Sequence, residues 1–148
     1  MSRHLKNVVR ELAVRSPSEA RRLFSDALAE LVAMEPPRPE PMSTHMIAAR
    51  FREVIGYREE ERFAAYFMDR AGACVGLRVF EGGSRTRTTL YPRELFKTAF
   101  ELGATGVILA HNHPSGTLMP SPQDRDLTRR VAELGESLEC RLVDHLIV

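Results

Sequence analysis

The fold of this chain depends on the stretch Gly106-Val107-Ile108-Leu109-Ala110-His111-Asn112-His113-Pro114-Ser115-Gly116. Its first five residues form a short, wholly apolar run, which is typical of a central strand buried on both faces of a sheet. Two histidines follow, one residue apart, and then a loop with proline and glycine. We therefore expect a buried strand that presents both histidines at its end.

This arrangement of side chains suggests a metal site. Residues i and i+2 of an extended segment point the same way, so His111 and His113 can face a common point. Asp124 lies eleven residues after His113, beyond a loop whose prolines and glycine allow the chain to fold back. Two imidazoles and one carboxylate leave the fourth position of a tetrahedral zinc ion for water, as catalytic zinc sites require. A nearby glutamate would take the proton of that water, and Ser121 could donate a hydrogen bond to a developing oxyanion.

The segment Ser121-Pro122-Gln123-Asp124 also has a simpler interpretation as the start of a helix. Serine is a good N-cap, proline suits the first helical position, and an aspartate in the first turn favours the helix dipole. A ligand role for Asp124 and a capping role are compatible, so the sequence leaves both open.

Upstream of the histidines, apolar patterns predict three strands and a helix. The runs 63–68 and 74–80 are expected to form a hairpin, and the β-branched residues in 86–90 suggest a third strand. A helix should begin at Pro92 and stop at Gly103. Together with the central strand, these elements predict an α/β fold with a mixed sheet.

Downstream of the loop we expect a helix over 122–138 and a last strand over 141–148. Strict alternation in this strand would place Leu142, Asp144, Leu146 and Val148 on one face, and Val143, His145 and Ile147 on the other. We interpret Asp144 and His145 as structural residues that hydrogen-bond to a ligand histidine.

The N-terminal region is predicted to be helical over 1–34, with the capping-box pattern Ser16-Pro17-Ser18-Glu19. The proline-rich run 35–41 cannot continue a helix and is typical of an extended spacer. A second short helix should follow, capped by Ser43 and ending near Gly56. We therefore divide the chain into a helical N-terminal segment with linker, residues 1–42, and a main domain, residues 43–148.

The chain has 148 residues, which suits about one domain with a buried core. The net charge of +1 lacks the basic footprint typical of nucleic-acid-binding proteins. Two distant cysteines argue against a cysteine zinc site and against a disulfide framework. No signal-peptide pattern and no apolar run of ~18 residues is visible. We expect a cytoplasmic, soluble protein with no membrane contact.

The motif His111-x-His113, followed after seven residues by Ser121-x-x-Asp124, resembles that of the JAMM (MPN+) metallohydrolases. The string from His111 to Gly116 is similar to the RadC-like branch of that family, and so are Tyr91-Pro92-Arg93-Glu94 and Asp144-His145-Leu146-Ile147. The resemblance covers about residues 58–148. It implies the helix-flanked mixed sheet of JAB/MPN domains, with cytidine-deaminase-like layering.

The resemblance also implies a zinc-dependent metallopeptidase acting on a peptide or protein. In that family the residues matching His111, His113 and Asp124 bind Zn2+, and the residue matching Ser121 assists the oxyanion. The family's glutamate base lies near the start of the first strand of the domain, which points here to the cluster 59–61. We predict Glu61 as the base because it stands at the entry to the apolar strand, although such clusters are by default solvated charge runs.

The alternative hypothesis is a non-enzymatic module, associated with DNA repair or mobile elements, that binds nucleic acid or a protein partner. RadC-like chains usually carry an N-terminal helix-hairpin-helix region, and residues 1–42 show no glycine-containing hairpin of that kind. A His-Asn-His nuclease is disfavoured because the following loop matches the hydrolase spacing. The family normally runs on past the position of Val148, so we expect a domain shortened at its C-terminal end. The oligomeric state stays open.

Overall fold

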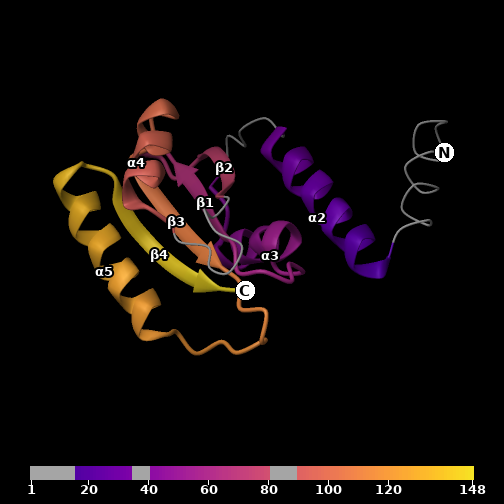
Figure 1. Ribbon diagram of the computed structural model, residues 1–148. Helices are drawn as coiled ribbons and strands as arrows, with labels where there is room; N and C mark the ends of the chain where they lie inside the picture. The colour runs from indigo at the N-terminus through magenta and orange to yellow at the C-terminus, as the bar shows by residue number, and fades with distance from the viewer. Residues whose placement is uncertain (1–15, 35–40, 81–89) are drawn as a thin grey trace.

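The computed structural model describes residues 16–34, 41–80 and 90–148 (Figure 1). Its elements follow in the order α2 Pro17–Met34, α3 Thr44–Ile55, β1 Phe63–Met68, β2 Cys74–Phe80, α4 Pro92–Glu101, β3 Gly106–His111, α5 Pro122–Ser137 and β4 Arg141–Ile147. Residues 1–15, most of the proline-rich run, and the strand expected over 86–90, apart from Leu90, lie outside the described residues. The division at residues 42 and 43 therefore stays a prediction.

The sheet is mixed, as expected. Its strand order is β2-β1-β3-β4; β1 runs antiparallel to both of its neighbours, and β3 and β4 run parallel. Parallel neighbours need a crossover connection, and α5 provides it. Helices α4 and α5 lie on one face of the sheet, and α3 and α2 lie on the other (Figure 1).

The core has two halves, one on each face of the sheet. On one side Phe67, Val107 and Leu109 pack with residues of α4 and α5, and on the other side Tyr66 and Ile108 pack with α3. Every residue of β3 is buried, which confirms the prediction of a central strand. In the part of the chain that is described, no helix is both long enough and apolar enough to cross a bilayer.

Helices α2 and α3 begin where their capping residues predict. The Ser43 hydroxyl accepts from the Met46 backbone N–H at 3.3 Å, and Ser16 and Glu19 exchange the corresponding bonds at the start of α2. The buried residues of α3 are Ile47, Phe51, Val54 and Ile55. The apolar stripe of α2 is buried only in part, because Leu28 packs against the core while Phe24 and Leu31 are more than 60% exposed.

The predicted alternation of β4 is wrong at its start. A register shift in the β3–β4 pairing leaves Val143 as an extra residue, since Val107 pairs with Leu142 and Ile108 pairs with Asp144. Such a bulge moves the following residues to the opposite face. Leu142 therefore packs on the side of α5, whereas Leu146 and Val148 pack on the side of α3.

The close approach of α5 to the start of β4 requires a glycine. A Cβ atom at Gly135 would lie 2.5 Å from the Cys140 carbonyl oxygen, and the Cys140 N–H donates to the Gly135 carbonyl at 2.9 Å. Neither backbone can shift without breaking this connection.

We expect Gly135→Ala to lower the free energy of unfolding by about 1–3 kcal/mol, the usual range for overpacking. Without this close contact, alanine in place of glycine would stabilise the helix interior by up to ~1 kcal/mol. Urea unfolding measures the change, with the exposed position Glu133→Ala on the same helix as the control. An unchanged or higher stability of Gly135→Ala would contradict the close approach.

Candidate metal centre

The three predicted ligands meet where β3 ends and α5 begins. His111 is the last residue of β3, and Asp124 lies in the first turn of α5. The two histidine Nε2 atoms are 3.0 Å apart, and each lies 3.4 Å from one carboxylate oxygen of Asp124. The structure thus brings together His111, His113 and Asp124, whose ligand atoms all lie within 4.8 Å of one another.

This spacing fits a zinc ion. Ligand atoms at about 2.0–2.1 Å from a tetrahedral ion are about 3.3 Å apart. The observed separations of 3.0–3.4 Å are close to that value. Nitrogen and carboxylate oxygen are also donor types that zinc accepts.

The tautomer of His113 suits a ligand. Its Nδ1 lies 2.8 Å from the Thr117 carbonyl oxygen, which can only accept, so Nδ1 carries the proton and Nε2 keeps its lone pair. A turn brings Thr117 back to the ring: the Gly116 N–H donates to the His113 carbonyl at 2.8 Å, and Gly116 has φ of 76°. Such a positive φ favours glycine.

Asp124 has the capping role that the sequence indicated, and it also lies beside the two candidate ligand histidines. It forms a capping box with Ser121, because the Ser121 backbone N–H donates to its carboxylate at 2.6 Å and its own N–H donates to the Ser121 hydroxyl at 3.1 Å. Burial acts to raise the pKa of the Asp124 carboxyl. The bonds from Ser121 and the nearby histidines outweigh this effect, so the pKa lies below its usual value.

His111 is almost fully buried and has contacts on every side. Its ring stacks on Phe63 with centroids 5.1 Å apart, and its Nδ1 lies 2.9 Å from His145 Nε2. Burial lowers the pKa of His111, against the opposing charge of Asp124, and burial also lowers the pKa of His145 to about 4. Both rings are therefore neutral near pH 7. The predicted hydrogen bond between His145 and His111 is confirmed, whereas the Asp144 carboxylate accepts from the His145 backbone N–H.

A cavity of about 420 Å³ is lined by two of the candidate ligands, His113 and Asp124, and Glu61 and Ser121 both contribute to its wall. Its other lining residues are Phe63, Leu90, His113, Gln123, Asp124, Asp126, Leu127 and Arg130. Ser121 thus shares a wall of this cavity with His113 and Asp124. This is the position in which a donor to a substrate oxygen would be useful.

Strand pairing explains why Glu61 reaches this cavity. Phe63 pairs with His111, and the Asn112 N–H donates to the Arg62 carbonyl at 3.3 Å, so one further antiparallel step places Glu61 opposite His113. Alternate residues share a face, so Glu61 lies on the same side as Phe63.

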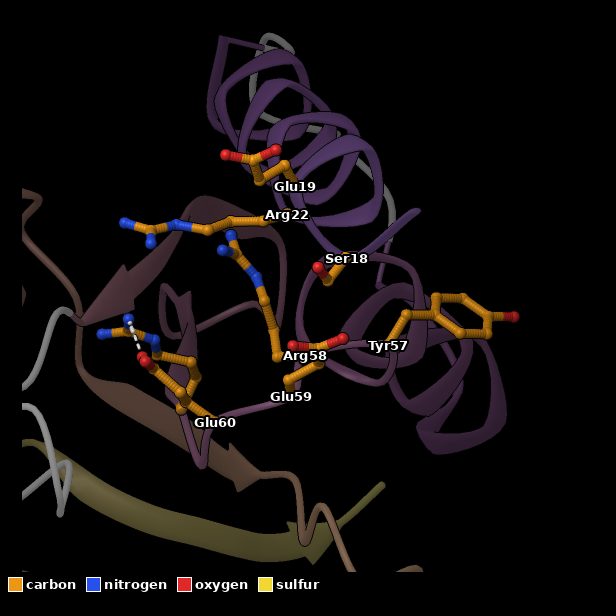
Figure 2. A pocket seen from close by; sticks show the side chains of 8 residues that line it. Ser18, Glu19, Arg22, Tyr57, Arg58, Glu59 and Glu60 are labelled. Carbon is orange, nitrogen blue, oxygen red and sulfur yellow. Dashed lines mark hydrogen bonds and ion pairs between the residues drawn. The ribbon is translucent and has the colours of Figure 1, made fainter. Parts of the chain in front are cut away.

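Glu59 and Glu60 line a different cavity, of about 190 Å³, with Arg58, Arg62 and residues at the start of α2 (Figure 2). There the Glu60 carboxylate accepts a hydrogen bond from Arg62 at 2.6 Å, which Figure 2 shows as a dashed line. Of the three adjacent glutamates, Glu61 alone is among the residues that line the cavity beside the candidate ligands.

Asn112 holds the glutamate segment in place. Its carbonyl oxygen accepts from the Arg62 backbone N–H at 2.7 Å, and its amide nitrogen donates to the carbonyl oxygens of Arg58 and Glu60 at 3.2 and 3.1 Å. The side chain is 1% exposed and uses both of its hydrogens. Asn112, which lies between the two histidines, thereby connects their backbone to the segment that carries Glu61.

The sequence reasoning missed Asn112 and Thr128. Alternation could have indicated Asn112, because a residue between two ligands on an extended segment points to the opposite side. Helical spacing could have indicated Thr128, because it lies one turn after Asp124 and shares its face. The partners of Asn112 and the His145 partner of Thr128 are distant in sequence, so local patterns do not identify these contacts.

Known proteins similar to this chain are described as UPF0758 proteins. One, from Burkholderia cenocepacia (strain HI2424), is 40% identical over 94 residues, which are 64% of this chain and 37% of that protein. Another, from Thermosynechococcus vestitus, is 38% identical over 106 residues, 72% of this chain and 42% of the relative. A third, from Trichodesmium erythraeum, is 32% identical over 128 residues, 86% of this chain and 50% of the relative. The chain thus matches half or less of each relative's length.

A family described as the RadC-like JAB domain matches residues 42–148, well over half of the chain. The matched region contains the mixed sheet, both candidate histidines, Asp124 and the cavity beside them. The resemblance in the motif residues is therefore confirmed over residues 42–148. The chain belongs to the RadC-like JAB domain family.

Proposed function

We propose that this chain is a zinc-dependent hydrolase of peptide or isopeptide-type amide bonds. The observation that carries the proposal is the convergence of His111, His113 and Asp124 beside a cavity lined by Glu61 and Ser121. Membership of the JAB family supports metallohydrolase chemistry in general terms. The substrate would be a peptide or protein.

His111, His113 and Asp124 would hold the ion. When bound by three residues, zinc would leave one position open, polarise a carbonyl there and lower the pKa of a water molecule to about 7. The residues are prepared for this role, since burial keeps His111 neutral and the pKa of Asp124 is lowered. Neither ligand would have to lose a proton near pH 7.

Glu61 would act as the general base. Glu61 lines the cavity with His113, so its carboxylate could accept a proton from water and pass it to the leaving amine. Ser121 would stabilise the oxyanion. Its oxygen accepts the Asp124 N–H as a helix cap, which leaves its own hydrogen to donate toward the cavity.

We expect wild-type protein to bind one zinc ion per chain, because the three ligands have tetrahedral spacing. His113→Ala and Asp124→Asn should lose this zinc, since two protein ligands hold the ion poorly. Elemental analysis after dialysis gives the stoichiometry, and the exposed His45→Ala is the matched control. Wild-type protein with no zinc at saturating metal would end the proposal.

We expect Glu61→Gln to keep its zinc but to lose about 10²–10⁴-fold in hydrolysis, the usual contribution of a general base. The assay would measure amide cleavage in a panel of peptides and lysine-linked isopeptides. Glu59→Gln and Glu60→Gln are matched controls, because these carboxylates line the other cavity, and both should stay near wild-type activity. A large loss in Glu60→Gln with none in Glu61→Gln would reassign the base.

Asn112→Ala should lower hydrolysis by up to about 100-fold while the protein still binds zinc, because Glu61 would lose its fixed position. Arg62→Ala is the control: it removes the ion pair with Glu60 but keeps the backbone N–H that Asn112 accepts. Parallel measurements of zinc content and cleavage rate separate the two effects. Equal activity in Asn112→Ala and wild type would show that the amide does not position the base.

A further inference from the structure

We propose that Thr128 and His145 form a positioning relay, which determines which ring nitrogen of His111 is free to bind metal. The inference rests on the proposed function, because it assigns His111 as a ligand. Neither Thr128 nor His145 lines the cavity that Glu61 and Ser121 share; both line a neighbouring cavity together with His111 and Asp124. Both would act through His111.

The relay consists of three contacts in series. The Thr128 hydroxyl donates to the Asp124 backbone carbonyl at 2.6 Å, and the same oxygen lies 2.6 Å from His145 Nδ1. His145 Nε2 lies 2.9 Å from His111 Nδ1. The contacts lead from Asp124 on α5, through His145 on β4, to His111 on β3. They therefore connect two candidate ligands that also contact each other directly.

The order of the protons follows from the first contact. A carbonyl oxygen accepts only, and a threonine hydroxyl has a single hydrogen. If that hydrogen pointed to His145, two oxygens without a hydrogen between them would face each other at 2.6 Å. The hydroxyl therefore donates to Asp124, and His145 Nδ1 donates to the hydroxyl.

The proton positions on the two histidine rings follow from this assignment. A neutral imidazole that donates from Nδ1 accepts at Nε2, so His145 accepts from His111 Nδ1. His111 then keeps a lone pair on Nε2, the atom that lies 3.0 Å from His113 Nε2 and 3.4 Å from the Asp124 carboxylate. The Thr128 hydroxyl is the group that sets this order.

Loss of the hydroxyl would remove the constraint. His145 could then carry its proton on Nε2 and donate to His111 Nδ1, which would leave the His111 proton on the nitrogen that should bind metal. The bulge at Val143 is also needed, because it places His145 on the face of the sheet from which it reaches His111.

The first test compares Thr128→Val with Thr128→Ser. Valine keeps the shape but removes the hydroxyl, and serine restores it. We expect Thr128→Val to weaken zinc binding 10–100-fold, the usual effect of losing an outer partner of a ligand histidine, with Thr128→Ser within about threefold of wild type. The probe is Zn2+ in competition with a chromogenic chelator at pH 7.

Thr98→Val is the matched control, because the Thr98 hydroxyl makes the same bond to a carbonyl four residues earlier but belongs to α4. It should leave zinc affinity unchanged. Zinc affinity of Thr128→Val within twofold of wild type would overturn the relay, and the proposed hydrolase function would stand.

The second test needs no variant. In metal-free, ¹⁵N-labelled wild-type protein, long-range ¹H–¹⁵N correlations of the imidazole rings should show His111 and His145 both protonated at Nδ1. An Nε2-protonated His111 would overturn the relay. This readout is independent of hydrolysis: a protein with the expected tautomers but no amidase activity would refute the proposed function and leave the relay intact.

Discussion

The alternation of side chains along His111-Asn112-His113 is the constraint on which the site depends. The two histidines point to the side of α5, where Asp124 and its capping residue Ser121 lie. Asn112 points the other way and holds the segment that carries Glu61. Because side chains alternate on an extended backbone, three consecutive residues position the candidate ligands and the candidate base at the same time.

Burial gives this arrangement its rigidity. His111, Asn112 and Asp124 are the buried polar or charged residues of the described chain, and each has hydrogen-bonding partners. A buried polar group left without a partner costs about 1–3 kcal/mol. Alternative placements of these side chains would break several such bonds together, so the hydrogen bonds hold the candidate ligands in one arrangement.

Much of the fold could be predicted because its signals are local. Ser43, Ser16 and Ser121 cap helices where their sequences indicate, and the apolar run at 106–110 is a central strand. The faces of β4 could not be predicted, because the bulge at Val143 depends on its pairing with β3. The roles of Asn112 and Thr128 were missed for a similar reason: their partners lie 50 or more and 17 residues away in the sequence.

The bulge at Val143 has a consequence for how the length of this domain can vary. A residue inserted or deleted between Cys140 and Asp144 would exchange the faces of Asp144 and His145, and a carboxylate would then face His111. Homologous chains should therefore hardly differ in length between α5 and His145.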